Sequence, residues 1–495
     1  MTVHTAEVAV VGAGFAGLLA ARELVRAGRE VTIIERGRLK SHAEQLATGS
    51  HEVKGLTTLH NHEPHPDTPY PWDYTYGIGG SSLHWTGVAP RLDRSDFELR
   101  TRYGIAEDWP IPYSALDSFY EESEQLLAVA GAPGTRGGNQ PPHPLSPLDR
   151  VLAPALAPLR GLPQSRATVE INGRLRCCGA NVCRLCPVDA RYSLLHTLED
   201  ERLLNEGGRV GVVDMTAVAS LVVERGKVVA LETVNAKRER GRIEAGTVVL
   251  AANGLENPGL LLRSGIDDPD VGRYLYDHGH RMLHIRTDED LPTGRGTAPI
   301  TSMSYAYADG PWRSERGAQL ILPYNPGLAV GDELADAVVQ GRTGSQALDD
   351  VRRRFKRTLI LDTVGEDLPR GDRQVELSPA KDRLGLPLNR VRYPRDEGYV
   401  ERGRQWMYED IERRLRPLGG RIVRCEETAM GAHSLGACRM GASDGVVDTD
   451  MRHRRFENLF VTGGSCFPTY GAAHPTLTIC ALAMRLGRKL GQDGG

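Results

Sequence analysis

The chain has 495 residues, enough for two or three domains and a large buried core. Its 61 basic residues nearly balance 64 acidic ones, and the net charge of -3 gives no reason to expect a nucleic acid or an anionic membrane as partner. No apolar run of about 18 residues occurs, so the sequence predicts no membrane-spanning segment. A strand pattern begins within the first few residues and leaves no room for a signal peptide, so we expect a cytoplasmic protein.

The N-terminal residues 8–37 read VAVVGAGFAGLLAARELVRAGREVTIIERG and predict a strand, a helix and a second strand. The apolar run at 8–11 is typical of a buried parallel strand. Gly12, Gly14 and Gly17 follow in the spacing G-x-G-x-x-G. In that spacing the first glycine turns the chain, the second lets backbone approach a pyrophosphate, and the third lets helix pack on strand.

The helix that begins near Ala16 offers its free N–H groups and positive dipole end to a diphosphate. Gly28 is expected to end this helix. The second strand, 31–34, leads to Glu35, and an acid at this point accepts hydrogen bonds from the adenosine ribose. The unit therefore predicts a dinucleotide site, without separating FAD from NAD.

The rest of the chain predicts a domain built from non-adjacent segments with another inserted into it. A Gly/Pro-rich loop covers 131–147, and a buried strand at 246–252 leads to a turn and then a helix at 258–263. Further segments are expected as short strands at 207–231, strand-rich regions at 282–325 and 371–393, and charged surface helices at 345–357 and 398–416.

Two histidines lie in separate motifs near the C-terminus. His433 opens HSLGACRMG, and His474 lies within GGSCFPTYGAAHPTLTICALAMRLG. Pro475 suits the first position of a helix, where its missing N–H costs nothing, and the apolar helix that follows ends in basic residues. Alcohol oxidation needs a base for the hydroxyl proton and a second group that fixes the hydroxyl, and two histidines fit these tasks.

Several stretches resemble the glucose-methanol-choline (GMC) oxidoreductases, which are FAD-dependent alcohol oxidases and dehydrogenases. Besides the two ends of the chain, they are GIGGSSLHWTGVAPR at 77–91, TVVLAANGLENPGLLLRSG at 247–265 and VGRYLYDH at 271–278. LHWTG and the C-terminal block are most similar to pyranose oxidases and bacterial sugar dehydrogenase flavin subunits. The middle, 290–425, which usually shapes the substrate pocket in the family, matches little.

The resemblance implies an α/β fold with a Rossmann-like FAD-binding domain and an inserted substrate-binding domain on a mainly antiparallel sheet. We expect the FAD-binding domain to comprise 1–100, 195–285 and 430–495. The substrate-binding domain then comprises 101–194 and 286–429, with a cysteine-rich loop at 177–186.

The resemblance also assigns roles to the two histidines. His433 matches the family's base, and His474 matches the partner position, where sugar-oxidising relatives often have Asn. Asp277 and His278 belong to a structural motif to which we give no catalytic role. The implied reaction oxidises a hydroxyl of a sugar, glycoside or polyol to a ketone or aldehyde, with hydride transfer to flavin N5.

The loop at 79–82 resembles the one that lies along the flavin in relatives, and His84 falls where pyranose oxidases tether FAD covalently. A packing histidine is the alternative for His84. The residues that we expect to bind the cofactor are Gly12, Gly14, Phe15, Ala16, Gly17, Glu35, Arg36, Gly79, Gly80, Ser81, Ser82, His84, Trp85, Thr86, Ala252, Asn253, Gly464, Pro475 and Thr476.

Four of the eight cysteines lie within ten residues: Cys177, Cys178, Cys183 and Cys186. The spacing C-x4-C-x2-C from Cys178 matches the first three ligands of plant-type iron-sulfur proteins. Some GMC sugar dehydrogenase subunits carry a cluster in this region, with one residue more in the last spacing. An iron-sulfur cluster, a zinc site and a metal-free loop all remain open.

The expected partners are a small-molecule alcohol and oxygen or another electron acceptor. An iron-sulfur cluster would favour a dehydrogenase that passes electrons to a partner, and a glycosylated natural product such as an aminoglycoside is an alternative substrate. Two other classes remain open: a flavin-binding redox sensor without catalysis, and a lyase that uses FAD as a scaffold.

Overall fold

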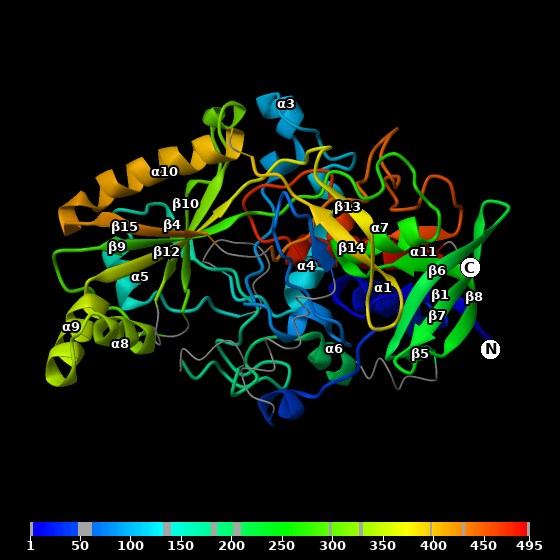
Figure 1. Ribbon diagram of the computed structural model, residues 1–495, viewed down its shortest axis with the longest axis horizontal. Helices are drawn as coiled ribbons and strands as arrows, with labels where there is room; N and C mark the ends of the chain where they lie inside the picture. The colour runs from blue at the N-terminus through cyan, green and yellow to red at the C-terminus, as the bar shows by residue number, and fades with distance from the viewer. Residues whose placement is uncertain are drawn as a thin grey trace.

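The computed structural model describes residues 3–47, 62–131, 140–179, 186–200, 209–296, 299–325, 330–396, 398–427 and 431–492. Two large sheets lie at opposite ends of the molecule, and both ends of the chain lie beside the first of them (Figure 1). No helix in these residues is long and apolar enough to cross a membrane.

The first sheet has seven strands in the order β5-β2-β1-β8-β7-β6, and the seventh, β16, pairs with β8. Strands β5, β2, β1, β8 and β16 are parallel to one another, whereas β7 is antiparallel to both of its neighbours, β8 and β6. The bounds are β1 Val3–Val11, β2 Val31–Ile34, β5 Val210–Val213, β6 Thr216–Glu224, β7 Lys227–Asn235, β8 Arg240–Leu250 and β16 Leu459–Val461.

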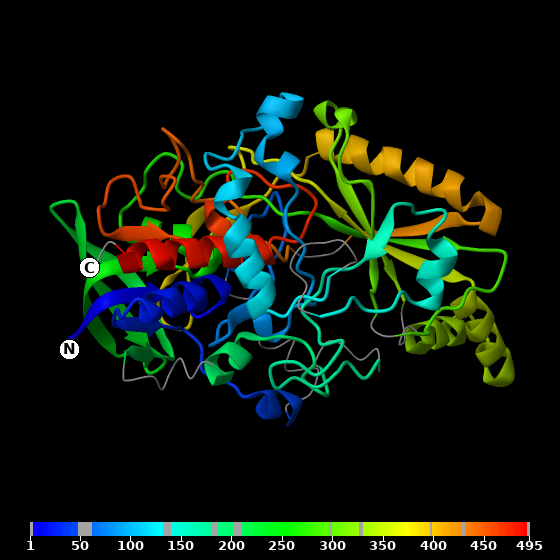
Figure 2. The same cartoon turned by 180° about the vertical axis from the view of Figure 1, so that it is seen from behind.

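Helices cover this sheet and bring the C-terminus back to the N-terminal unit. Helix α1 (Phe15–Arg26) packs against α11 (Thr476–Gln492), which in turn packs against α4 (Asp117–Leu126), and Figure 2 shows the three side by side. Residues 8–11 of β1 are all buried, which accounts for their unbroken apolar pattern. Because β1, β2 and β8 are parallel, their carboxyl ends lie at the same edge of the sheet.

The second sheet is antiparallel, in the order β15-β9-β12-β11-β10-β4. Its bounds are β4 Leu159–Gly161, β9 His280–Arg286, β10 Ser302–Tyr307, β11 Gln319–Tyr324, β12 Thr358–Gly365 and β15 Arg421–Glu427. Helix α10 (Tyr399–Leu415) packs on one face, where Leu283, Leu361 and Met407 share a core. The side chains on the other face alternate with these and include His280 on β9 and Asp362 on β12.

The remaining elements are smaller. A three-stranded sheet joins β13 (Gln374–Lys381), β14 (Pro387–Arg392) and β3 (His62–Pro64). Further α-helices in the described residues include α3 Leu99–Tyr103, α5 Pro147–Leu152, α6 Leu194–Asp200, α7 Asn253–Arg263, α8 Val330–Val339 and α9 Gly344–Lys356.

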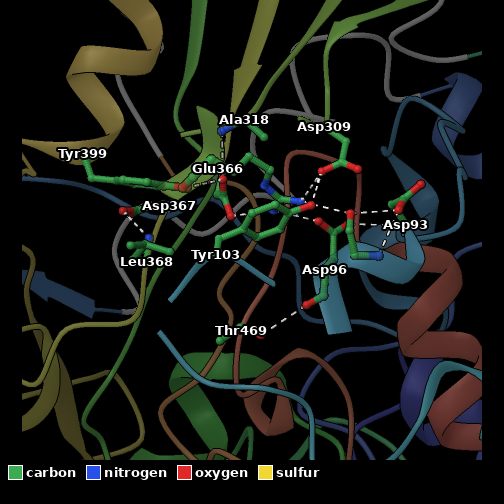
Figure 3. A network of polar contacts seen from close by, with 12 residues as sticks. Asp93, Asp96, Tyr103, Asp309, Ala318, Glu366, Asp367, Leu368, Tyr399 and Thr469 are labelled. Atoms are coloured by element: carbon green, nitrogen blue, oxygen red, sulfur yellow. Dashed lines mark hydrogen bonds and ion pairs between the residues drawn. The ribbon is translucent and has the colours of Figure 1, made fainter. Parts of the chain in front are cut away.

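A buried charge network joins the segment that carries Asp96 to the second sheet, where Glu366 directly follows β12. Arg313 is fully buried and donates from Nη2 to Asp96 at 2.9 Å and to Glu366 at 2.7 Å. Glu366 also accepts from the Tyr399 hydroxyl at 3.1 Å, and Figure 3 shows Asp96, Glu366 and Tyr399 gathered at this junction. Desolvated ions of both signs are therefore paired where this segment meets the second sheet.

The predicted α/β class with a parallel-rich sheet and a mainly antiparallel second sheet is confirmed. Two local predictions are wrong in their bounds: strand β8 begins at Arg240 rather than at Gly246, and helix α7 begins at Asn253 rather than at Pro258. Asn253 Oδ1 accepts from the N–H groups of Leu255 at 2.8 Å and Glu256 at 3.0 Å, and so caps an earlier start. The domain boundaries stay a prediction, although β9 pairs within the second sheet while the boundary at 285 falls inside it.

Candidate active site

One cavity of about 420 Å³ runs from the glycine fingerprint to the two C-terminal histidines. It is lined by Gly12 and Gly14 at the end of β1, by Glu35 after β2, and by His433 and His474. Residues more than 400 positions apart thus share one surface. Of the residues predicted to bind the cofactor, all line this cavity except Gly17, Gly79 and Ser82.

The glycines of the fingerprint have three different surroundings. A Cβ atom on Gly17 would lie 1.9 Å from the carbonyl oxygen of Gly12, so the close packing of α1 on β1 requires glycine there. Gly12 has a φ of +103° and faces the backbone of Ala251. A Cβ on Gly14 would meet nothing within 4 Å, so its open side faces the cavity. Gly14 therefore leaves open space at the wall of the cavity, where we predict that the pyrophosphate binds.

Glu35 is buried at the end of β2, and its carboxylate is held by backbone N–H groups. Oε2 accepts from Ala13 at 2.9 Å, and Oε1 accepts from Gly37 at 2.8 Å and Gly77 at 3.0 Å. Burial raises the pKa of Glu35, although these hydrogen bonds oppose the shift. A carboxylate has about four acceptor sites, so the ribose contact remains compatible with these bonds and stays a prediction.

Buried polar atoms along the cavity fit a polar ligand. Within the described residues, Arg36 Nε, Thr462 Oγ1 and His474 Nδ1 are buried without a hydrogen-bond partner, and all three residues line the cavity. The N-terminus of α11 adds Pro475 and Thr476 to the same wall, with the positive end of a helix dipole. The residues present therefore suit an anionic dinucleotide such as FAD.

His84 lies in the wall of the cavity next to Ser81 and Trp85. Its Nδ1 is 2.9 Å from the Thr75 hydroxyl, so one ring nitrogen is engaged with the protein. Burial lowers the pKa of His84 to about 4 and keeps the ring neutral at ordinary pH. A neutral ring with its second nitrogen directed away from Thr75 is compatible with either a flavin tether or a packing role.

Four imidazole rings cluster at the histidine end of the cavity. The ring centroid of His278 lies 4.2 Å from that of His433, 4.6 Å from that of His280 and 5.1 Å from that of His474. His433 and His474 are 5.6 Å apart and nearly perpendicular. Nε2 of His278 and Nδ1 of His433 form a hydrogen bond. The structure therefore brings the two predicted histidines together and adds two more.

Asp277 holds the chain that carries His433. Its carboxylate accepts from the backbone N–H groups of Ala432 at 3.2 Å and His433 at 3.3 Å, and from the Tyr70 hydroxyl at 3.3 Å. Burial raises the pKa of Asp277 to about 7. This arrangement fits the structural role predicted for the Asp277–His278 motif.

The four rings differ in how easily they accept a proton. Burial, together with neighbouring histidines, lowers the pKa of His433 to about 3 and lowers those of His278 and His474 well below the ordinary value. Burial also lowers the pKa of His280, but the Asp362 and Asp277 carboxylates together outweigh it, so the net shift is upward. His280 is therefore the ring of the cluster on which a positive charge is most stable.

Sequence reasoning missed His280 and Asp362, which line the cavity from β9 and β12. Asp362 interrupts the apolar run TLILDTVG, and a carboxylate within a buried strand is a signal that could have found it. The predicted metal site at the four cysteines stays a prediction. Cys183 lies outside the described residues, and Cys177, Cys178 and Cys186 are free thiols.

The cluster has one further feature. Ring nitrogens of His278, His280 and His433 lie within 4.8 Å of one another. We assign no metal to them, because His278 and His433 are hydrogen-bonded to each other and His280 is bonded to Asp362.

Comparisons with known proteins give a consistent result. Residues 117–280 and 369–483 match the description "GMC oxidoreductase", and residues 7–68 match "FAD dependent oxidoreductase". The chain is 30% identical to 6'''-hydroxyparomomycin C oxidase of Streptomyces lividus, over 98% of this chain and 91% of that protein. It is 26% identical to the fructose dehydrogenase large subunit of Gluconobacter japonicus, over 97% of each. The structure of pyridoxine 4-oxidase from Mesorbium loti superposes with a TM-score of 0.67 at 19% identity, covering 98% of this chain and 99% of that one.

Proposed function

Because the chain belongs to the GMC oxidoreductase family and is an FAD-dependent enzyme, we propose that it oxidises a hydroxyl group of a sugar, glycoside or polyol to a ketone or aldehyde. The observation that carries this proposal is the single cavity that joins the dinucleotide fingerprint to His433 and His474. A redox sensor without catalysis has no need of two histidines at the end of its cofactor cavity.

FAD, when bound, would supply a two-electron acceptor for the carbinol hydrogen. The protein's part is to bind the alcohol, orient it and move its hydroxyl proton. His433 takes this proton, because its neutral ring lies in the cavity with Nδ1 engaged by His278 and its backbone fixed by Asp277. His474 fixes the hydroxyl, because its Nδ1 is buried in the same wall without a partner among the described residues.

The substrate class rests on relatives that are named for fructose and for an aminoglycoside, so a free sugar and a glycosylated natural product are both reasonable. The finer proposals are a covalent FAD link at His84 and an iron-sulfur cluster at Cys177, Cys178, Cys183 and Cys186. The cluster would favour a protein electron acceptor over oxygen. The cytoplasmic location is likewise a proposal from the sequence alone.

The test is anaerobic mixing of the FAD-loaded protein with a panel of sugars, polyols and aminoglycosides, while the flavin absorbance is followed. Bleaching by one class identifies the substrate, and we expect His433→Ala to slow bleaching by about 10²- to 10⁴-fold, the range for loss of a general base. His453→Ala is the matched control, because His453 is also buried but lies outside the residues that line the cavity.

Two analyses accompany this experiment. Flavin that stays in the pellet after acid precipitation supports the His84 link, and flavin in the supernatant excludes it. Iron in the purified protein supports the cluster. Bound flavin that no alcohol bleaches, with His433→Ala behaving as the parent, contradicts the proposed function.

A further inference from the structure

His280 and Asp362 bring an ionisable pair to the cavity from the second sheet. Nδ1 of His280 lies 3.1 Å from Oδ1 of Asp362, and both residues line the cavity that contains His433 and His474. The register fixes this contact: His280 on β9 is paired with Val364 on β12, and Asp362 is the next residue on the same face. The pair is thus built into the sheet and does not depend on a loop.

The pair is electrostatically unlike the rest of the cluster. Asp362 is mostly buried, with a side chain that is 13% exposed, and its charge is directed at the His280 ring. Nδ1 of His433 is 3.9 Å from Asp277, and that carboxylate is already occupied by backbone N–H groups. Among the four rings, within the described residues, only His280 has a side-chain carboxylate within hydrogen-bond distance.

A base whose pKa is low holds a proton only weakly. It therefore needs a second group to which the proton can be transferred. His433 is such a base, since burial lowers the pKa of its ring to about 3. The ring centroids of His433 and His280 are 6.2 Å apart with the rings stacked, a gap that one hydroxyl group or water molecule can bridge. A proton that leaves His433 therefore has a stabilised position within one relay step.

We propose that His280, held by Asp362, is a catalytic residue that receives the substrate's hydroxyl proton from His433 and keeps it until the product leaves. This inference rests on the proposed function. The substrate O–H bond breaks, its electron pair forms the second carbon–oxygen bond, and the carbinol hydrogen leaves with its own electron pair to the FAD. The proton rests on Nε2 of His280, because Nδ1 donates to Asp362. It returns to solvent after the carbonyl product departs.

The charges that face His280 come from several elements. Asp362 on β12 and Asp277 before β9 favour the charged ring, whereas Arg404 on α10, which donates to the Gly279 carbonyl at 3.2 Å, opposes it. The other groups near the ring are His278, His433 and His474. The balance favours a protonated His280 at pH values where the other three rings are neutral.

The test combines a spectroscopic titration with a pH profile. In FAD-loaded protein with ¹⁵N-labelled histidine, we expect one ring to titrate above pH 6.5, to be missing in His280→Gln, and to titrate about 1–3 pH units lower in Asp362→Asn. His280 must be neutral to receive a proton, so flavin reduction should rise with pH through the same pKa. Asp362→Asn should move that limb to lower pH by the same amount. His280→Gln should remove it and slow reduction about 10²-fold or more.

The matched control lies on the same strand. His284 Nε2 is 3.2 Å from Glu426, and neither residue lines the cavity. His284→Gln and Glu426→Gln should leave both the titration and the pH profile unchanged. If these controls shift the limb as much as Asp362→Asn does, or if His280→Gln keeps the parent profile, the inference is wrong. Failure of the proposed function looks different, because then no alcohol bleaches the flavin of the parent protein.

Discussion

Nε2 of His278 is hydrogen-bonded to Nδ1 of His433, and the two rings lie 4.2 Å apart. The contact fixes which nitrogen of His433 remains for the substrate, since the tautomer of a histidine follows the bond made by its other nitrogen. His278 is fully buried and is separated from His433 by 155 residues in the chain. If His433 is the base, as proposed, we expect His278 to act as a positioning residue, although the sequence motif that contains it gives no catalytic signal.

We expect His278→Phe to slow flavin reduction tenfold to a hundredfold or so, because losing one hydrogen bond to a buried group costs about 1–3 kcal/mol. Stopped-flow reduction at saturating substrate measures this. His278→Gln, whose amide reaches the position of Nε2, should recover most of the rate. A purely structural role predicts instead that both variants lose rate in proportion to their loss of folded protein.

The fingerprint glycines give a second prediction. We expect a substitution at Gly14 to weaken cofactor binding and a substitution at Gly17 to weaken folding. Alanine at Gly14 has open space and an extended backbone with φ of -87°, so Gly14→Ala should change the free energy of unfolding by less than about 1 kcal/mol. Its methyl group projects into the space for the pyrophosphate and should weaken FAD binding about tenfold or more, since each 1.4 kcal/mol is tenfold in affinity.

Gly17→Ala should behave in the opposite way. Its Cβ would lie 1.9 Å from a backbone oxygen, so α1 must shift from β1 at a cost of about 1–3 kcal/mol. Urea unfolding of FAD-free protein, with titration of added FAD, distinguishes the two variants. Equal loss of stability in both would show that the Gly14 surroundings are not open, and full FAD affinity in Gly14→Ala would place the pyrophosphate elsewhere.

How much could be predicted from the sequence depended on the range of the interactions. Strand β2 was predicted with its observed bounds, because an apolar run between a helix end and an acid is a local pattern. Helix α7 was predicted to begin too late, because Pro258 was taken as its first residue although the Asn253 side chain caps an earlier turn. The local sequence was therefore sufficient to predict β2. For α7 the local signal was present in Asn253 but was misinterpreted.

The candidate site divides in the same way. His433 and His474 were found because each lies in a recognisable motif, whereas His280 and Asp362 meet only through the register of β9 with β12. The two are 82 residues apart, and a shift of one residue in this pairing would direct Asp362 to the other face of the sheet. No pattern within either strand determines that register. The ring cluster is therefore a property of the tertiary structure.

The buried network at Arg313 should carry a large part of the stability of the junction. Arg313→Met leaves Asp96 and Glu366 buried without their cation, and losing one partner of a buried pair costs about 3–5 kcal/mol. Arg352→Met is the control, because Arg352 is 74% exposed and its pair with Asp349 belongs to a class worth about 0–1 kcal/mol. Urea unfolding of both variants gives the comparison. A similar loss in the two would mean that water reaches Arg313.

Adding Glu366→Gln to Arg313→Met tests whether the charges act as one unit. The second substitution removes a carboxylate that has lost its cation, so the double variant should be less destabilised than the sum of the single variants. Additive losses would contradict a coupled network.

The stability of the protein should rise with pH between about 4 and 6.5. Burial lowers the pKa of seven of the described histidines, so the unfolded chain, with ordinary values near 6.5, binds protons in this window that the native state does not. The pKa is lowered to about 4 for His62, His84, His143 and His453, to about 3 for His433, and well below the ordinary value for His278 and His474. Each histidine therefore contributes stability that is lost as the pH falls below the pKa of that histidine in the unfolded chain.

Four buried carboxyl groups act in the opposite direction, because burial raises the pKa of Glu35, Asp96, Glu124 and Asp277. Burial raises the pKa of Asp96 to about 6 and that of Asp277 to about 7, so the native state binds protons there that the unfolded chain has released. Seven histidines outnumber these four carboxyl groups, so the net slope of stability against pH should stay positive. Urea unfolding of FAD-free protein at half-unit steps measures it. His143→Asn should lower the slope by up to about 1.4 kcal/mol per pH unit, the value for one proton. A flat profile, or an unchanged slope in His143→Asn, would mean that these histidines are hydrated in the native state.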